Sequence, residues 1–404
     1  MKEAAFSRQP VELGLFLGVA PTAGGMFQYA QSLAEALSKL DPVRYKVTIA
    51  YSDQEWAPIL VRLGLQGKTL KHVKWGQRIA NAAMVLQIPA GMCQRLLCWF
   101  NPLVNELRQL RCDAWIFPAQ EALSYQMPGL VVGTIHDLMH RYEPHFPEVS
   151  SGFRFHIREQ RFRNISRACV AVLVDSKVGQ DQVVQSYHVE ASKIFSLPYV
   201  APSYLSSTNE REDFDRHYQL PFRFLFYPAQ FWPHKNHKRL IESIKTVAQR
   251  YPDVALVLSG GFRHAYEEVR DYAEALGMVE RIRFVGYVPD TDLQGFYRRA
   301  RALVMPTFFG PTNIPPLEAM ALGCPVLVSG IYGMFEQCGD AALYFSPLSV
   351  DEMTDQILKV WGDDALAQEL ARKGIERSQG KTQLQFNDQV RTILDRVFAA
   401  VVQK

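Results

Sequence analysis

The sequence has little of what marks membrane-spanning, nucleic-acid-binding or disulfide-stabilised proteins. No apolar run approaches the ~18 residues that a membrane-spanning helix needs. The formal net charge is only +3, and no block of five or six like charges occurs, so nothing indicates a nucleic-acid partner. The six cysteines form no CxxC pair, and we expect them to be free, buried thiols in a reducing compartment.

The amino-terminal residues MKEAAFSRQPVELGLFLGVA invite comparison with a signal peptide. Their apolar core is short, is interrupted by Glu12 and leads into a glycine turn instead of a cleavage site. We therefore expect a first β-strand over residues 11–18, and a cytoplasmic protein.

Length and composition predict two α/β domains. A chain of 404 residues is long for a single core, and 48% of its residues are hydrophobic, as in globular proteins. Short apolar runs alternate with amphipathic stretches, which is typical of parallel sheets flanked by helices. Strands are expected over residues 11–18, 45–52, 114–118, 131–137 and 169–176, and again over residues 222–229, 254–260, 282–288, 302–306 and 325–329.

The predicted fold class is therefore α/β, with two Rossmann-like doubly wound domains that face each other across a cleft, where such sheets bind ligands. We expect residues 1–200 to form the first domain and residues 201–384 the second. A helix at about 385–404 is expected to pack back on the first domain. The stretch 197–221 is rich in Pro, Ser and charged residues. Its apolar residues follow neither a helical nor a strand period, so we interpret it as a linker.

Residues 79–104 are more apolar than the rest of the chain. Basic residues lie just upstream, namely Lys68, Lys71, Lys74 and Arg78. Two interpretations stay open. The segment forms either a pair of helices packed on the first sheet and broken at Pro89, or an amphipathic surface through which residues 68–104 contact an anionic membrane. Core burial explains most apolar helices, which favours the first.

Two candidate sites in the first half follow expected strands. Gly24 and Gly25 end a turn and begin a helix, whose amino terminus favours an anion, although a tight turn without a ligand explains them equally well. His136 ends another expected strand, and its imidazole could donate to a phosphate or sugar hydroxyl or only cap its own loop. His140 and His145 lack the spacing of a strong metal motif.

The stretch 226–244 places Gln230, Lys235 and Asn236 between a strand and a helix. The helix dipole disfavours a cation at a helix amino terminus, so Lys235 is easier to understand if a bound anion lies between them. We therefore expect a diphosphate contact at Lys235.

The stretch 305–329 is the most informative. A strand ends, a proline-rich loop follows, and a helix begins near Pro316. Asn313 and Ile314 can present backbone N–H groups to an anion. Glu318, early in this helix, either complements the helix dipole or accepts hydrogen bonds from a pair of vicinal hydroxyls.

Together these stretches resemble the retaining glycosyltransferases of family 4, the glycosyl transferases group 1, which have the GT-B fold of two Rossmann-like domains. The resemblance follows the family in order and spacing over nearly the whole chain. The segments that carry it are AGGMFQYAQSLAEAL, TIHDL, VDSKVGQDQVV, FVGYVPDTDLQGFYRRARALVMPT, IPPLEAMALGCPVLVS and FEQCGDAALYFSP.

The resemblance implies roles for individual residues. Lys235 would hold the donor diphosphate with the amides of Asn313 and Ile314, and Glu318 would bind the nucleotide ribose. His136 would contact the transferring sugar and, with Lys235, act in catalysis. The further donor-binding positions are Gly24 and Gly25 at the phosphates, main chain at Val285, Tyr287 and Val288 at the base, and Gln230, Pro311 and Thr312.

Two positions depart from the family pattern. Gly310 stands where the family often has Glu, and Gln230 stands where it often has Arg. Losing one charge of each sign keeps the local charge balanced. Thr312 and Asn313 are expected to take over the sugar contacts.

The resemblance implies a metal-independent retaining hexosyltransferase with no cofactor beyond its nucleotide-diphosphate sugar. We expect a GDP-mannose-like donor and a glycan or lipid-linked acceptor in surface polysaccharide or glycolipid synthesis, on the inner face of the membrane. Asp290 and Asp292 form a DxD pair, but they precede a helix and are interpreted as its caps. A sugar-nucleotide 2-epimerase and a non-catalytic sugar-nucleotide or glycan-binding module remain alternatives.

Overall fold

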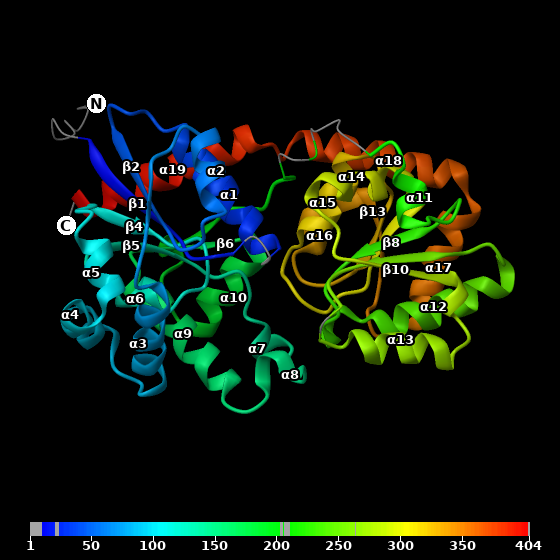
Figure 1. Ribbon diagram of the computed structural model, residues 1–404, viewed down its shortest axis with the longest axis horizontal. Helices are drawn as coiled ribbons and strands as arrows, with labels where there is room; N and C mark the ends of the chain where they lie inside the picture. Colours follow the sequence, from blue (N-terminus) through cyan, green and yellow to red (C-terminus); the bar gives the residue numbers. More distant parts are fainter. Residues whose placement is uncertain (1–9, 21–23, 203–204, 206–210, 263, 403–404) are drawn as a thin grey trace. The chain divides into compact units, whose positions relative to one another are not determined.

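The computed structural model describes residues 10–20, 24–202, 205, 211–262 and 264–402, and the chain divides into two compact units (Figure 1). Unit 1 contains residues 1–198 and 383–404, and unit 2 contains residues 199–382. Each unit has its own sheet and its own hydrophobic core.

Unit 1 is built on a seven-stranded parallel sheet in the order β3-β2-β1-β4-β5-β6-β7. Its strands are β1 (Val11–Leu17), β2 (Tyr45–Tyr51), β3 (Gly67–Thr69), β4 (Ala114–Ile116), β5 (Leu130–Thr134), β6 (Ala171–Val174) and β7 (Ile194–Ser196). Every residue of β6 is buried, because helices cover both faces of such a sheet, and this explains its uninterrupted apolar sequence AVLV.

Helices connect these strands. They are α1 (Gly25–Ser38), α2 (Trp56–Arg62), α3 (Val73–Val85), α4 (Ala90–Phe100), α5 (Pro102–Arg108), α6 (Leu123–Gln126), α7 (Met139–Tyr142), α8 (Pro147–Ser150), α9 (Arg154–Ala168) and α10 (Lys177–Tyr187). The last helix of the chain, α19 (Gln383–Val402), also belongs to unit 1 and lies beside α1 (Figure 1). Asp395 of α19 accepts hydrogen bonds from Tyr45 at 2.6 Å and from Arg44 at 2.9 Å, which ties the end of the chain to β2.

Unit 2 has a six-stranded parallel sheet in the order β10-β9-β8-β11-β12-β13. Its strands are β8 (Leu225–Pro228), β9 (Leu256–Ser259), β10 (Ile282–Gly286), β11 (Ala302–Met305), β12 (Val326–Ser329) and β13 (Ala342–Phe345). Its helices are α11 (Phe214–Tyr218), α12 (His237–Arg250), α13 (Tyr266–Ala275), α14 (Asp290–Arg299), α15 (Ile314–Ala321), α16 (Met334–Cys338), α17 (Val350–Gly362) and α18 (Asp364–Gln379).

The predicted fold class is confirmed as two doubly wound α/β units. Each of the ten expected strands coincides with an observed one. The strands that the sequence patterns did not indicate are β3, β7 and β13, and each lies at the edge of its sheet. β3, with the sequence GKT, has no apolar run, and β7, with the sequence IFS, has only two apolar residues. β13 does have an apolar run, ALYF, which the expected strands left out.

The interpretation of residues 197–221 as a linker is wrong for part of the stretch. Residues 214–218 form α11, and Phe214 is only 1% exposed in the core of unit 2. Its ring meets that of Phe296 at a centroid distance of 5.0 Å. A helix of five residues is too short to show a helical period, which is why the pattern missed it.

Both sheets contain a point where the strand order reverses. In unit 1 the chain runs outward in one direction from β1 and in the other from β4, and in unit 2 the corresponding strands are β8 and β11. Loops that follow adjacent strands on either side of such a point diverge and leave a crevice at the carboxyl edge of the sheet. The two switch points therefore indicate where each unit binds a ligand.

Candidate functional site

The loop after β8 carries Lys235 at the switch point of unit 2. A 3₁₀ turn over Pro233–Lys235 positions the lysine, and the hydroxyl of Tyr227 on β8 donates to its carbonyl oxygen at 3.1 Å. Asn236 follows in a left-handed conformation with φ of 62° and ends this turn. Helix α12 then begins at His237. Lys235 thus lies two residues before the helix, as the sequence predicted, where a bound anion can contact both.

The side chain of Asn236 holds this loop against the neighbouring strands. Its Nδ2 atom donates to the carbonyl oxygen of Pro306 at 3.1 Å and to that of Pro347 at 2.8 Å. Because Pro306 directly follows β11, this bond joins the two sides of the switch point. Asn236 is therefore a positioning residue for Lys235.

His237, at the start of α12, is a neutral, buried imidazole. It is 2% exposed, and its ring stacks on Phe231 at 4.7 Å. Neither ring nitrogen has a hydrogen-bond partner among the described residues. Burial, with the adjacent charge of Lys235, lowers the pKa of His237 to about 3. His237 is therefore uncharged near neutral pH.

The loop over residues 307–313 forms the other side of the switch point and is built around Gly310. Gly310 has φ of +93°, and a Cβ there would come within 2.8 Å of the carbonyl oxygen of Thr312. The Phe309 ring stacks on His234 at 3.9 Å, and the Phe308 amide donates to the His234 carbonyl at 2.9 Å. A glutamate, which the family often has at position 310, would be strained in this loop.

The backbone amide of Asn313 is already in use. It donates to Oε1 of Gln337 at 2.9 Å, and Nε2 of Gln337 donates to the Asn313 carbonyl at 2.5 Å. Pro315 and Pro316 have no N–H group, so within the first turn of α15 an anion can reach Ile314 and Leu317. The expectation that both Asn313 and Ile314 offer amides therefore needs correcting, because the Asn313 amide is available only if Gln337 moves.

The helix α15 begins two residues earlier than expected, at Ile314, and carries Glu318 in its second turn. Glu318 is 2% exposed, and the hydroxyl of Tyr297 on α14 donates to its Oε2 atom at 2.5 Å. A carboxylate can accept about four hydrogen bonds, so Tyr297 and a vicinal diol can share it. The buried bond to Tyr297 shows that Glu318 does more than complement the helix dipole.

The segment expected to line a base follows β10. A register shift between Phe284 and Gly286 interrupts the pairing with β9 at the carboxyl end of the strand. Tyr287 is 67% exposed, whereas Val288 is buried. Nearby, Gln230 is exposed and accepts a hydrogen bond from Trp232 at 2.9 Å. These residues lie at the same carboxyl edge of the sheet as Lys235, since all its strands run parallel.

In unit 1, Gly24 and His136 belong to the loops at the carboxyl edge of the first sheet. Gly24, with φ of 62°, directly precedes α1, which begins at Gly25. His136 is 7% exposed, and its Nε2 atom donates to the Pro118 carbonyl at 2.9 Å. Burial lowers the pKa of His136 to about 4, so the ring is neutral near pH 7. In this tautomer Nδ1 is an acceptor, which corrects the expectation that the imidazole donates to a sugar hydroxyl.

The residue beside His136 belongs to a charged cluster that the sequence did not indicate. Asp137 accepts hydrogen bonds from Arg158 at 2.5 Å and from the Met139 amide at 3.0 Å.

At the switch point itself, the Glu121 carboxylate packs against Gly18, where a Cβ would collide with it. Its Oε2 atom is buried without a hydrogen-bond partner among the described residues. Burial raises the pKa of Glu121 to about 8, although the charge of Arg161 opposes this.

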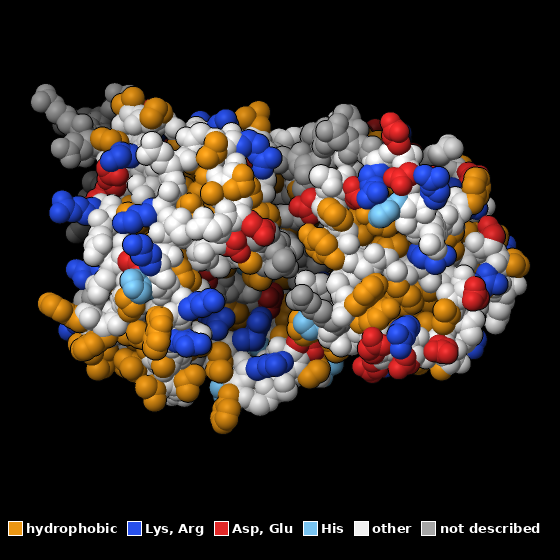
Figure 2. Space-filling model, viewed as in Figure 1, with side chains coloured by type: hydrophobic (Ala, Val, Ile, Leu, Met, Phe, Trp, Pro, Cys, Tyr) orange, Lys and Arg blue, Asp and Glu red, His pale blue; other side chains and the backbone are white. Residues whose placement is uncertain are grey.

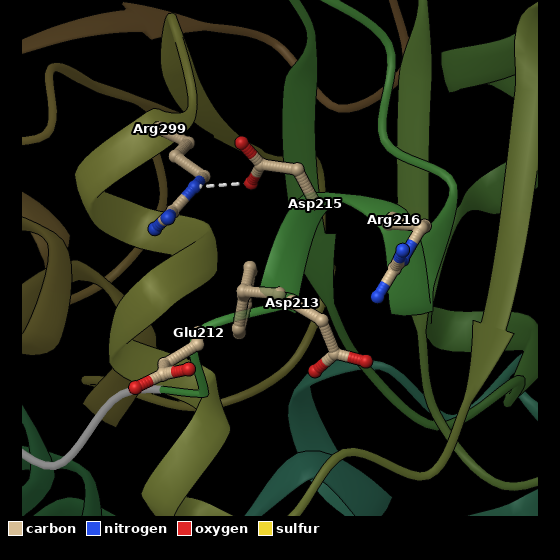
Figure 3. Close-up of a pocket in the computed structure, with 6 residues that line it drawn as sticks. Glu212, Asp213, Asp215, Arg216 and Arg299 are labelled. Atoms are coloured by element: carbon tan, nitrogen blue, oxygen red, sulfur yellow. Dashed lines mark ion pairs between the residues drawn. The ribbon is translucent and has the colours of Figure 1, made fainter.

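A separate pocket of about 500 Å³ lies in unit 2 beside α11 (Figure 3). Charged residues dominate its lining, and Asp215 is paired with Arg299 at 2.5 Å. Both α11 and the end of α14 directly precede strands, which places the pocket at the amino edge of the sheet. Its position at the amino edge separates it from the switch point, which lies at the carboxyl edge.

Asp290 and Asp292 do not cap α14 with their side chains, as the sequence had suggested. The helix begins at Asp290 with Pro289 as its cap residue, and Asp292 accepts a hydrogen bond from Tyr218 at 2.6 Å. In the described part of the chain, no three His, Cys, Asp or Glu side chains form a cluster able to hold a metal.

The structure thus gathers most of the expected positions at the carboxyl edge of unit 2. These are Gln230, Lys235, Val285, Tyr287, Val288, Pro311, Thr312, Asn313, Ile314 and Glu318. Gly24, Gly25 and His136 lie in unit 1. Sequence reasoning missed Tyr297 and Gln337, the partners of Glu318 and Asn313, because each partner comes from another helix and carries no motif of its own.

Two doubly wound α/β units, each with its own switch point, make up the architecture called the GT-B fold. Residues 209–377 match the family described as Glycosyl transferases group 1. This stretch contains the whole of the unit 2 site, so unit 2 is similar to the glycosyltransferases of that group.

Known proteins of similar sequence include enzymes of O-antigen synthesis. The O-antigen chain mannosyltransferase B of Escherichia coli is 27% identical over 305 residues, which cover 70% of this chain and 78% of that protein. The O-antigen chain mannosyltransferase RfbU of Salmonella typhimurium is 28% identical over 214 residues, or 53% of this chain and 56% of that protein. The second alignment therefore spans little more than half of each protein.

Solved structures support the fold over almost the full length. The Anabaena protein HepE, in a crystal structure with UDP and glucose, superimposes with a TM-score of 0.73 at 16% identity. The superposition covers 95% of this chain and 99% of that chain. At this level of identity the likeness concerns the fold.

Proposed function

We propose that this protein transfers mannose from GDP-mannose, or a closely related hexose from its nucleotide diphosphate, to a glycan or lipid-linked acceptor. The observation that carries the proposal is the position of Lys235 before α12, opposite the amino terminus of α15, at the switch point of the family-matched unit. The mannosyltransferase relatives in O-antigen synthesis favour mannose and a surface polysaccharide or glycolipid as product.

The proposed donor contacts combine the roles that the family resemblance implies with the positions of these residues in each unit. Lys235 and the Ile314 amide bind the diphosphate, Glu318 binds the ribose, and main chain at residues 285–288 contacts the base. Thr312 and the side chain of Asn313 contact the sugar. In unit 1, His136 accepts a hydrogen bond from a hydroxyl of the transferring sugar, and the loop at Gly24 and Gly25 approaches the phosphates.

The proposed reaction retains the anomeric configuration and needs no metal. The acceptor oxygen forms a bond to the anomeric carbon as the bond to the leaving phosphate oxygen breaks. The acceptor hydroxyl passes its proton to that phosphate oxygen, so no protein nucleophile takes part. Lys235 stabilises the negative charge that grows on the diphosphate, a contribution that strengthens in the transition state.

An assay of transfer tests this proposal. The protein is incubated with radiolabelled GDP-mannose or UDP-glucose and a panel of polyprenyl-linked and free oligosaccharide acceptors, with and without EDTA. We expect GDP-mannose to be consumed and an α-linked product, shown by NMR of the anomeric proton, in both conditions. An inverted product overturns retention, and loss of activity with EDTA overturns metal independence.

The two alternatives have their own signatures in the same assay. A sugar-nucleotide 2-epimerase would convert the donor without any acceptor. A non-catalytic binding module, which Gly310 and Gln230 bring into consideration, would bind nucleotide but consume none.

A further inference from the structure

Large exposed hydrophobic side chains of unit 1 gather on α3, α4 and the loop between them. They include Trp75, Leu86, Met92, Leu96, Trp99 and Phe100, called here the α3–α4 surface. Trp99 exposes 78% of its surface and Phe100 exposes 71%. Figure 2 shows hydrophobic side chains gathered over this part of the molecule, with lysine and arginine side chains beside them. Concentrated exposure of this kind marks an interaction site.

The residues of the α3–α4 surface do not take part in the packing between the two helices. Ala83, Cys93 and Leu97 are buried and pack with each other and with Ile79 and Ile88 between α3 and α4. The helices therefore have a buried apolar side and a second, exposed apolar side. Core packing, which the sequence favoured as the explanation for residues 79–104, accounts only for the first.

The charges along the stretch of chain that forms the surface all have one sign. Between Glu55 and Glu106 the sequence has no acidic residue, although it has six basic ones. The exposed basic residues on or just before these helices are Lys68, Lys71, Lys74, Arg78 and Arg95. Glu106 itself accepts hydrogen bonds from the amides of Lys71 and His72, both at 3.0 Å, at the start of α3. The exposed side chains of this stretch are thus apolar or basic, and their complement is apolar and anionic.

We propose that the α3–α4 surface docks on a lipid bilayer with anionic headgroups. Tryptophan side chains are favoured at the boundary between headgroups and acyl chains, and basic side chains near an anionic leaflet contribute roughly fivefold each to binding. An amphipathic surface of this composition lies in the interface and does not cross it. No helix among the described residues is long and apolar enough to span a bilayer. The proposal does not depend on the identity of the donor or acceptor.

Co-sedimentation of the full chain with large unilamellar vesicles tests the proposal. We expect binding to vesicles of phosphatidylglycerol and phosphatidylcholine, little binding to phosphatidylcholine alone, and a blue shift of tryptophan fluorescence on binding. The double variant Trp99→Ser/Phe100→Ser and the triple variant Lys68→Glu/Lys71→Glu/Lys74→Glu should each lower the partition coefficient at least tenfold.

Phe222 provides the matched control, because it is fully exposed and belongs to unit 2, not to the α3–α4 surface. Phe222→Ser should bind vesicles as the unaltered protein does. Thermal unfolding and GDP binding check that each variant remains folded. Equal binding to both kinds of vesicle, or no binding to either by folded protein, overturns the proposal. A dimer in sedimentation velocity that Trp99→Ser/Phe100→Ser dissociates would also overturn it, since the surface would then bind a second copy.

Discussion

The hydroxyl of Tyr297 donates to Oε2 of Glu318 over 2.5 Å, and the two side chains are 1% and 2% exposed. Tyr297 comes from α14 and Glu318 from α15, so the bond crosses between two helices that precede and follow β11. Hydrogen bonds to an ionised carboxylate are short and strong. Tyr297 therefore fixes the orientation of the carboxylate that we assign to the ribose.

Substituting Tyr297 and Glu318 one at a time should distinguish their contributions to the unfolding free energy and to nucleotide binding. Tyr297→Phe removes the bond and should lower the free energy of unfolding by about 1.5–3 kcal/mol, measured by urea denaturation. Glu318→Gln keeps the shape but loses the charge, and should weaken GDP binding about tenfold in titration calorimetry. Full GDP affinity in Glu318→Gln would remove Glu318 from the proposed donor site.

The backbone at Gly310 leads to a prediction about the loop over residues 307–313. Gly310→Ala places a Cβ at φ of +93° and close to the Thr312 carbonyl, and should cost about 1 kcal/mol or more of unfolding free energy. Gly261→Ala is the control, because nothing lies within 4 Å of its Cβ position and its φ is ordinary. Gly310→Glu should reduce transfer activity. Higher activity in Gly310→Glu would show that the loop accommodates the residue common in the family.

Glu121 should make the stability of the protein depend on pH. Burial raises the pKa of this carboxyl to about 8 in the folded protein, above its ordinary value of 4.5. Between these values the folded state binds more protons than the unfolded state, so this contribution to stability is complete below pH 4.5 and is lost as the pH rises through about 8.

The isosteric Glu121→Gln tests this directly. It should raise the free energy of unfolding at pH 9 by roughly 1–3 kcal/mol and have much less effect at pH 5. Exposed Glu280→Gln serves as the control and should give parallel curves with the unaltered protein. Urea denaturation at a series of pH values measures both. A Glu121→Gln effect that is the same at every pH would contradict the raised pKa.

His136 should remain neutral throughout the working pH range. Its pKa is lowered to about 4 from 6.5, so the stability that depends on its neutral form is complete above 6.5 and is lost as the pH falls through about 4. His136→Gln should slow transfer about tenfold or more without changing the shape of the pH–rate profile above pH 5. Disappearance of an inflection near neutral pH in the variant would show that His136 titrates there.

Sequence patterns could predict those parts of the molecule that depend on local residues. The covered strands were visible as apolar runs, and Lys235 was placed before its helix because strand and helix patterns flank it. The edge strands β3 and β7 were not visible, because three partly exposed residues show no such run. The apolar run ALYF of β13 was present in the sequence but was not recognised as a strand.

Sequence patterns could not predict the contacts between helices that are distant in the sequence. The partners of Asn313 and Glu318 lie 24 and 21 residues away along the chain, and no spacing rule pairs them. The apolar sequence of α3 and α4 likewise does not reveal which of its side chains are buried. Trp99 and Leu97 are both large apolar residues of α4, yet only Leu97 packs inside unit 1.

The central claim is that Lys235 holds the diphosphate of a nucleotide sugar, and thermal unfolding with added nucleotides tests it most directly. GDP and GDP-mannose, at about 100 times their dissociation constant, should stabilise the protein by about 2.7 kcal/mol, whereas UDP and ADP should not. The stabilisation should vanish in Lys235→Ala and persist in Lys245→Ala, an exposed lysine on α12. No shift with any nucleotide in folded protein, or an undiminished shift in Lys235→Ala, would contradict the account.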